Sequence, residues 1–203
     1  MKSISLFTFC ILFSLFQAIH TSGKSKPNII YLMLDEWGYF ESGHMGSTDL
    51  ITPNIDQFAL EGVRFTNAYA GAPVCGPTRC SLLTGLHAGN MSMRVNNGHS
   101  PIRADEPTLA TVLKTKGYAT GGFGKWGIGG RGTTGVPEKH GFDLFFGYYD
   151  QVHAHTFYPS YLIRNSEEVP LPGNSGNSFY EGKTHAQLEI FKESISFIKK
   201  HKD

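Results

Sequence analysis

The sequence predicts an α/β fold, a doubly wound and mostly parallel sheet with helices on both faces. Residues 28–34 form an apolar run that ends abruptly in Asp35-Glu36-Trp37-Gly38, as expected of a strand buried on both faces of a parallel sheet. Helical spacing at residues 52–62 and 108–116 alternates with short apolar runs, an order typical of parallel strands joined by helices. The pattern stops at Asp203, where another strand is expected, so the predicted sheet is incomplete.

Local signals place the remaining elements. In chain order they are a helix at 52–62, a strand at 63–70, a helix after Cys75, a helix at 108–116 with Gly117 as its C-cap, a strand at 118–123, and loops with one short hairpin at 128–182. The Thr184 hydroxyl is expected to cap a final helix, with Gln187 three residues on as its capping partner.

The first 22 residues predict a secretory signal peptide. One early positive charge, Lys2, precedes an apolar run from Ile4 to Ile19 that is short and interrupted by polar residues. An uncleaved anchor is the alternative, but a run of this length predicts no stable membrane insertion. The protein is therefore expected to be exported, to a secreted, periplasmic or lysosomal location.

Composition and cysteine content restrict the function. The chain of 203 residues is 40% hydrophobic and 17% charged, which is ordinary for one globular domain, and its net charge of +1 argues against a nucleic-acid partner. Outside the signal region only Cys75 and Cys80 remain. Because they lie five residues apart across a proline and into a helix start, a disulfide is difficult to form, which suggests that Cys75 is retained for chemistry.

Residues 73–85 read Pro-Val-Cys-Gly-Pro-Thr-Arg-Cys-Ser-Leu-Leu-Thr-Gly. A proline followed by apolar residues predicts a helix that begins just after Cys75, where free N–H groups and the positive end of the helix dipole favour an anion. About one turn later, Arg79 offers a planar fork of donors that stays charged. The alternative for Cys75 is a buried structural cysteine beside a proline turn.

This stretch resembles the signature of the sulfatase family, Cys-x-Pro-[Ser/Thr/Ala]-Arg followed by two free positions, two apolar residues, Thr and Gly. Thr78 stands where Ser is commoner. Other segments that resemble arylsulfatases are Lys26 to Asp35, Thr52 to Asp56, Gly117 to Trp126 and Gly141 to Tyr148. The resemblance implies an alkaline-phosphatase-like fold and identifies residues 24–203 as the amino-terminal portion of a sulfatase catalytic domain.

The resemblance also implies residue roles. Cys75 matches the cysteine that formylglycine-generating machinery converts to the catalytic nucleophile, and Pro77 and Arg79 match the residues which that machinery reads. Arg79 and Lys125 are implied as catalytic residues, and Lys125 and His155 as substrate-binding residues. A surface lysine is the alternative for Lys125.

A bound divalent cation, usually Ca²⁺, is a further implication, with Asp35, Glu36 and Cys75 as ligands. The family usually shows Asp-Asp where this chain has Asp35-Glu36, and Ca²⁺ tolerates the exchange because it accepts six to eight oxygens in flexible geometry. An ordinary solvated turn is the alternative. The second pair of metal ligands in the family is expected beyond residue 203, so the chain supplies half of a metal site.

Two further positions bear on the chemistry. The family's commonest residue after Gly-Lys-Trp is His, whereas this chain has Gly127, so the proton acceptor for breakdown of the intermediate is unassigned. His153 and His155 alternate and would face the same side of a strand; solvated loop histidines are the alternative.

The sequence thus predicts a sulfuric ester hydrolase, arylsulfatase-like, that cleaves sulfate monoesters of aryl or carbohydrate substrates. One alternative is a phosphonate or phosphate monoester hydrolase on the same scaffold. A second is a truncated, non-catalytic chain that binds sulfated glycans.

Overall fold

The computed structural model describes residues 26–202, except 98–99 and 177. The predicted signal peptide, residues 1–22, lies outside the described residues. The chain divides into two units, residues 1–33 and 34–203. Residues 26–33 of the first unit contain no helix or strand, and the second unit carries every described element. None of the described helices is long and apolar enough to span a membrane.

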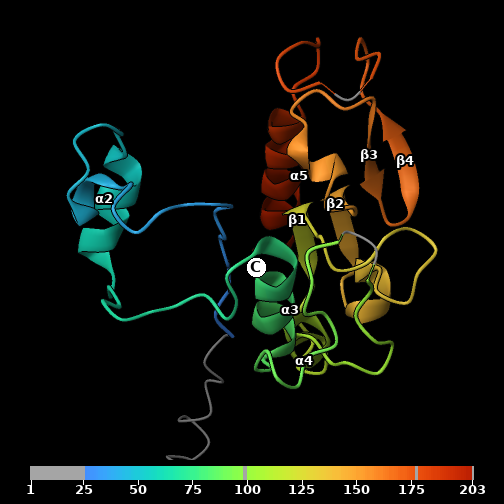
Figure 1. Ribbon diagram of the computed structural model, residues 1–203, viewed down its shortest axis with the longest axis horizontal. Helices are drawn as coiled ribbons and strands as arrows, with labels where there is room; N and C mark the ends of the chain where they lie inside the picture. Colours follow the sequence, from blue (N-terminus) through green and yellow to red (C-terminus); the bar gives the residue numbers. More distant parts are fainter. Residues whose placement is uncertain (1–25, 98–99, 177, 203) are drawn as a thin grey trace, which may run out of the picture. The chain divides into compact units, whose positions relative to one another are not determined.

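The sheet has four described strands in the order β1-β2-β3-β4 (Figure 1). They are β1 (Gly121–Lys125), β2 (Leu144–Tyr148), β3 (Tyr161–Arg164) and β4 (Glu167–Pro170). The β1–β2 pair is parallel, whereas β2–β3 and β3–β4 are antiparallel. The described sheet is therefore mixed, and only its first pair has the parallel arrangement that the sequence predicts for most of the sheet.

The described residues form four α-helices in addition to the sheet. They are α2 (Pro53–Glu61), α3 (Cys75–Thr84), α4 (Leu109–Lys114) and α5 (Ala186–His201), with three short 3-10 helices, η1 (Gly43–Met45), η2 (Pro137–His140) and η3 (His153–His155). The predicted helices at 52–62, after Cys75 and at 108–116 are confirmed. At the start of α4 the Thr108 hydroxyl accepts from Thr111 N at 3.2 Å and the Thr111 hydroxyl accepts from Thr108 N at 2.8 Å, so this cap is encoded locally.

The last helix begins two residues later than predicted. Gln187 N donates to the imidazole Nδ1 of His185 at 3.2 Å, so His185 caps α5. The Thr184 hydroxyl instead donates to the carbonyl of Pro172 at 2.6 Å. The predicted cap at Thr184 is wrong because the hydroxyl is hydrogen-bonded to a carbonyl 12 residues earlier in the chain.

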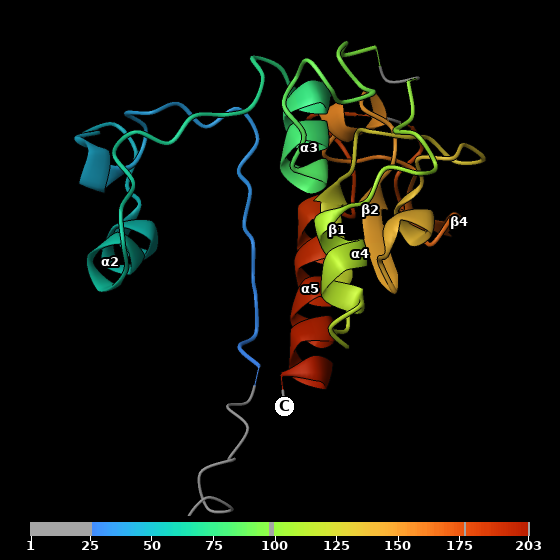
Figure 2. The same ribbon diagram turned by 90° about the horizontal axis from the view of Figure 1, so that it is seen from below.

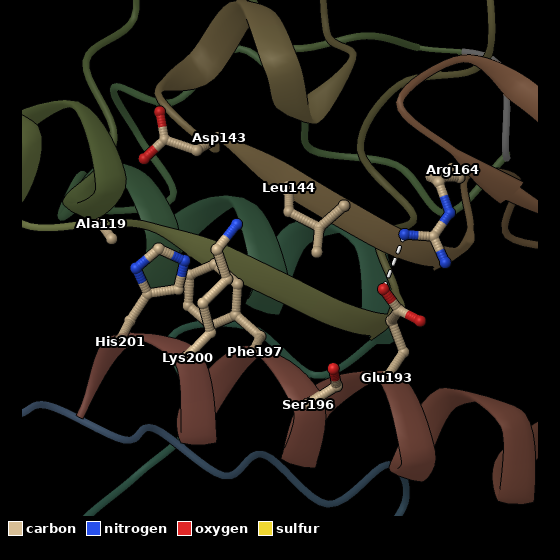
Figure 3. A pocket seen from close by; sticks show the side chains of 9 residues that line it. All are labelled: Ala119, Asp143, Leu144, Arg164, Glu193, Ser196, Phe197, Lys200 and His201. Carbon is tan, nitrogen blue, oxygen red and sulfur yellow. Dashed lines mark hydrogen bonds and ion pairs between the residues drawn. The ribbon is translucent and has the colours of Figure 1, made fainter.

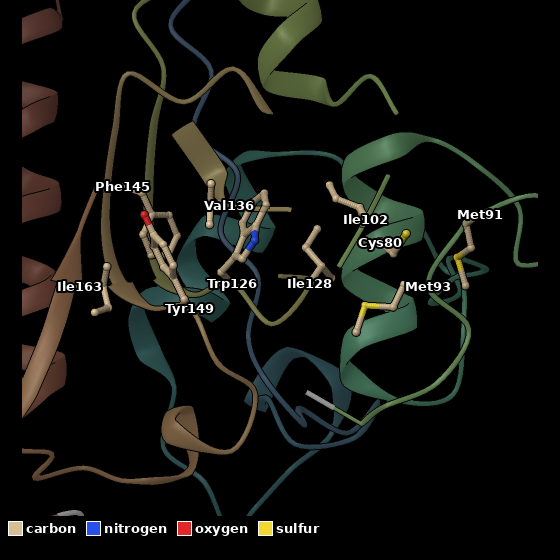
Figure 4. Close-up of a cluster of buried hydrophobic side chains, with 10 residues drawn as sticks. All are labelled: Cys80, Met91, Met93, Ile102, Trp126, Ile128, Val136, Phe145, Tyr149 and Ile163. Carbon is tan, nitrogen blue, oxygen red and sulfur yellow. The ribbon is translucent and has the colours of Figure 1, made fainter. Parts of the chain in front are cut away.

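Helices cover both faces of the sheet, as predicted. Successive residues of a strand point to opposite faces, and on one face Phe145 packs in a cluster with Cys80 of α3 (Figure 4). On the other face Phe146 packs in a second cluster with Ala186 and Ile190 of α5, the helix that runs alongside β1 and β2 (Figure 2). The two clusters fix α3 on one face of the sheet and α5 on the other.

Two predicted strands are absent from the described residues. Residues 28–34 and 63–70 have no strand pairing, and their side chains are largely exposed, as at Leu32 (78%) and Phe65 (78%). An apolar run indicates that a segment tends to be buried, but a strand also needs a neighbour whose N–H and C=O groups pair with its own. The runs do not specify that neighbour, which is why these predictions were wrong.

The segment 128–182 is more ordered than its composition predicts. Its one predicted hairpin is confirmed as β3–β4, joined by Asn165 and Ser166 with φ of 44° and 70°, the paired positive values of a type I′ turn. Strand β2 was not predicted. Near its end, a Cβ on Gly147 would lie 2.0 Å from the carbonyl oxygen of Gly124 in β1, so only glycine allows this pairing.

A buried carboxylate holds the loop that packs against α3. Glu106 is 4% exposed, and it accepts hydrogen bonds from Ser92 N at 3.0 Å, Arg103 N at 2.9 Å and the Ser92 hydroxyl. Burial opposes ionisation, but the hydrogen bonds from Ser92 and Arg103 outweigh it and hold the pKa of Glu106 below its ordinary value. The ionised carboxylate therefore stabilises the fold.

We expect Glu106→Gln to lower the free energy of unfolding by about 2 kcal/mol at pH 7, because the charge-assisted hydrogen bonds are lost. Since the pKa of Glu106 is lower in the folded state, this contribution is present above the unfolded value of about 4.3 and disappears as the pH falls through the folded value. Urea unfolding at pH 7 and pH 3 measures it. Asp105→Asn, at a side chain 88% exposed, is the control and should change little. An equal loss for both variants at pH 7 would contradict the prediction.

Candidate active site

Cys75 is the first residue of α3, one position further into the helix than predicted. The residue before it, Val74, is extended and provides no side-chain cap, and Gly76 N donates to Asn96 Oδ1 at 3.0 Å. The Thr78 hydroxyl donates to the carbonyl of Ala72 at 2.6 Å, which ties the incoming loop to the first turn. Cys75 thus lies at the positive end of a ten-residue helix.

Arg79 follows Cys75 by four residues, so the two side chains share one face of α3. It is 8% exposed. Its Nη2 donates to Asp35 Oδ1 at 2.9 Å and its Nη1 donates to the carbonyl of Lys125 at 2.5 Å. These bonds join α3 to the end of β1 and to the segment that follows residue 34.

Lys125 is the last residue of β1, and its side chain is 8% exposed. Its Nζ donates to Asp35 Oδ2 at 2.9 Å and lies 3.3 Å from His155 Nε2. One carboxylate is therefore shared by two cations. Burial opposes ionisation of Asp35, but the hydrogen bonds from Lys125 and Arg79 outweigh it and keep its pKa below the ordinary value.

The predicted metal ligands do not assemble into one cluster. Glu36 has a left-handed φ of 55° and is exposed, while both oxygens of Asp35 bond to cations. Within the described ranges, no three or more His, Cys, Asp or Glu side chains are placed to hold a metal. Ca²⁺ takes six to eight oxygens, so the described residues do not by themselves fit it. Ligation by Asp35, Glu36 and Cys75 stays a prediction.

The two alternating histidines have different environments. They lie in η3, where each residue turns the chain by about 120°, rather than on a strand, so the expectation that they share one side is wrong. His153 packs between the rings of Tyr148 and Tyr161, and burial lowers its pKa. His155 reaches Lys125. Only His155 therefore joins the group around Asp35.

One buried residue at this site was not predicted from the sequence. Gln151 is 2% exposed, and its Oε1 lies 2.5 Å from the point where a Cβ on Gly127 would be. Arg79 Cδ lies 3.4 Å from the same point. Gly127 was the sequence signal that could have indicated a buried residue here. Because glycine has no side chain, it leaves space that the side chain of a residue such as Gln151 can occupy.

A separate hollow of about 520 Å³ lies between α5 and the sheet (Figure 3). Arg164 and Glu193 form an ion pair of 2.6 Å across it. Its lining contains none of the predicted site residues, so we do not assign the chemistry to it.

The described site can bind an anion. Arg79 lies one turn into the helix that Cys75 begins, and Lys125 is joined to Arg79 through Asp35. Helix N–H groups, guanidinium and ammonium together favour a tetrahedral oxyanion. Asp35 offsets one of the two positive charges and holds both side chains in place, so one positive charge is left for an anion.

Comparisons with known proteins identify the family of the chain. The family model described as Sulfatase matches residues 27–203. Human arylsulfatase D is 41% identical over 141 residues, which cover 63% of this chain and 24% of that protein. N-acetylgalactosamine-6-sulfatase of Sus scrofa is 33% identical over 201 residues, 89% of this chain and 37% of that protein. The chain thus spans about a quarter to a little over a third of the length of these relatives.

Solved structures show the same architecture. Ps i-CgsB in complex with k-i-k-neocarrahexaose is 27% identical with a TM-score of 0.73, covering 87% of this chain and 42% of that one. A protein bound to its substrate D-glucosamine-2-N,6-O-disulfate is 27% identical with a TM-score of 0.69, covering 86% and 31%. The fold is the alkaline-phosphatase-like α/β fold, of which the described residues form a part. With the family model matching most of its length, the chain belongs to the sulfatase family.

Proposed function

We propose that the protein hydrolyses sulfate monoesters, with the converted Cys75 as nucleophile. The observation that carries the proposal is the convergence of Arg79 and Lys125 on Asp35, one helical turn from Cys75 at the start of α3. The oxygens of a sulfate ester carry one negative charge, which these donors can stabilise where it grows during displacement, typically by a few kcal/mol for each donor.

Aryl and carbohydrate sulfates are the proposed substrates. The relatives include an arylsulfatase and an N-acetylgalactosamine-6-sulfatase, and two similar structures hold a neocarrahexaose and a glucosamine disulfate. These ligands are carbohydrates, which supports a glycan sulfate as one substrate of this chain.

The residues of this chain have distinct parts in the reaction. Once residue 75 is converted to formylglycine, one hydroxyl of its hydrated aldehyde would attack sulfur while the bond from sulfur to the alcohol oxygen breaks and the alcohol leaves with a proton. The second hydroxyl would then lose its proton, which re-forms the aldehyde and releases sulfate. Arg79 and Lys125 bind sulfate oxygens and offset the charge that develops on them. Asp35 fixes both cations in position, and His155, whose Nε2 lies 3.3 Å from Lys125 Nζ, would contact the bound ester.

Ca²⁺ remains part of the proposal, with Asp35, Glu36 and Cys75 as ligands. Both carboxylates belong to the hard oxygen donors that Ca²⁺ prefers. Because these residues supply fewer oxygens than Ca²⁺ takes, we assign it no step in the reaction. Calorimetric titration with Ca²⁺ measures whether the chain binds the ion.

Export and conversion of Cys75 belong to the same proposal. Pro77 and Arg79, which the modifying machinery is expected to read, are buried in the folded chain. The machinery would therefore act before α3 packs against the sheet, as the chain enters the export route.

Two measurements on the protein from its own host test the proposal. The mass of the peptide that contains Cys75 should be about 18 Da below that of the thiol form, the difference between cysteine and formylglycine. The protein should also hydrolyse an aryl sulfate faster than the matching aryl phosphate. An unmodified thiol in a host that has the machinery, or faster phosphate turnover, would overturn the assignment.

A further inference from the structure

The site contains buried polar atoms that no part of the described chain satisfies. Among the described residues, the buried side-chain atoms without a hydrogen-bond partner are Arg79 Nε, both amide atoms of Gln151, and His153 Nε2. Leaving a buried donor or acceptor unpaired costs stability, so such groups are uncommon and call for an explanation. Three of the four atoms belong to Arg79 and Gln151.

Backbone pairing fixes where Gln151 lies. Beyond the ends of β1 and β2 the ladder continues, with Trp126 N donating to the carbonyl of Tyr148 at 2.8 Å and Gly127 N to that of Tyr149 at 3.1 Å. Asp150 Oδ1 then accepts from His153 N at 2.9 Å, which starts the η3 turn. This course of the backbone from β2 to η3 places the buried side chain of Gln151 beside Gly127.

Gln151 and Arg79 are both neighbours of Gly127. Gln151 Oε1 and Arg79 Cδ both lie within 3.4 Å of the position of a Cβ on residue 127. Gly127 has a φ of 74°, a left-handed conformation suited to glycine. Any larger residue at 127 would meet the carboxamide of Gln151, so the glycine and the glutamine depend on each other.

We propose that Gln151 is a further ligand-binding residue of this site, whose carboxamide donates a hydrogen bond to the tetrahedral oxyanion that Arg79 binds. This inference rests on the proposed function for the identity of the anion as sulfate. The carboxamide is neutral and exchanges no proton, so it only positions the ligand.

The unpaired state of the amide favours this role over a structural one. A glutamine that held the fold together would bond to backbone or side-chain groups, as Glu106 does. Gln151 makes no such bond at either amide atom. No group of the described chain pairs with its amide, whereas an oxyanion beside Arg79 would pair with the Nε2 donor.

Gln151→Met separates the two roles, because it keeps the length and volume of the side chain and removes only the amide. We expect the affinity of the intact protein for inorganic sulfate, measured by calorimetry, to fall about tenfold. The melting temperature should stay unchanged or rise, since an unpaired polar group has left the core. Gln187→Met, at an exposed position in the first turn of α5, is the matched control and should change neither quantity.

A second variant disturbs the same contact from the side of residue 127, where alanine also strains a left-handed backbone and should lower the melting temperature. Gly127→Ala places a Cβ against Gln151 Oε1 and should weaken sulfate binding as Gln151→Met does, while the double variant should lose little more than either single one. The inference is overturned if Gln151→Met retains sulfate affinity, whatever its melting temperature, or if the unaltered protein binds no sulfate. If that protein binds sulfate through Gln151 but hydrolyses no sulfate ester, the proposed function fails and this inference stands.

Discussion

Replacing Cys75 by alanine should reduce the turnover of a sulfate ester by a factor on the order of 10⁴ or more. Alanine cannot be converted to formylglycine, so the variant has no group to attack sulfur. The fold should persist, because Cys75 is the first residue of α3 and is only partly buried. The rate of aryl sulfate hydrolysis measures the loss of turnover, and the circular dichroism spectrum shows whether the fold persists.

The other cysteine of the described chain provides the control. Cys80 is completely buried in the cluster with Met91 and Met93, and burial raises the pKa of its thiol, which makes it unreactive. Cys80→Ala should leave a small cavity and lower stability by about 1–2 kcal/mol while the folded protein keeps its turnover rate. If Cys80→Ala removed activity without unfolding the protein, or Cys75→Ala retained it, the nucleophile would be misassigned.

Lys125→Met should lower kcat/KM for a sulfate ester by about 10²–10³-fold. The substitution keeps most of the apolar stem but removes one of the two fixed cations at the site, so charge developing on the sulfate oxygens is less well stabilised. Asp35 keeps its 2.9 Å contact with Arg79, and the fold should therefore survive. Steady-state kinetics at pH 7 measures the loss, and Lys125→Arg should recover part of it.

Lys114→Met is the matched control for this second prediction. Lys114 also pairs with a carboxylate, Asp143, at 2.5 Å, but both side chains are about half exposed and lie outside the predicted site. Removing it should cost no more than about 1 kcal/mol of stability and leave kcat/KM unchanged. Equal losses of activity for Lys114→Met and Lys125→Met would indicate a general effect of charge and contradict the assigned role of Lys125.

Much of the candidate site follows from residues that are close in sequence. The spacing of Cys75 and Arg79 places both on one face of α3 once the helix forms, and a proline with apolar residues after it predicts that helix. The capping pair Thr108 and Thr111 likewise fixes the start of α4. Helices can be predicted from sequence because their hydrogen bonds and their neighbouring side chains on one face join residues only three or four positions apart.

The arrangement of strands was harder to predict. The apolar run at 28–34 has no strand pairing in the described structure, whereas the aromatic segment 144–148 forms β2 between β1 and β3. A strand is completed by hydrogen bonds to a partner far along the chain, and composition does not name that partner. The close approach of Gly124 and Gly147 that permits the β1–β2 pair appears only when both strands are in place.

The family resemblance, the helices and the residue types of the site can be read from the chain alone, because they depend on local spacing and on side-chain chemistry. Which side chains meet is established by the fold. It placed Asp35 between Arg79 and Lys125, separated His153 from His155, and brought Gln151 beside Gly127. These contacts depend on strand pairing, which joins residues distant in sequence, and on the conformation of η3. No short stretch of the chain specifies them.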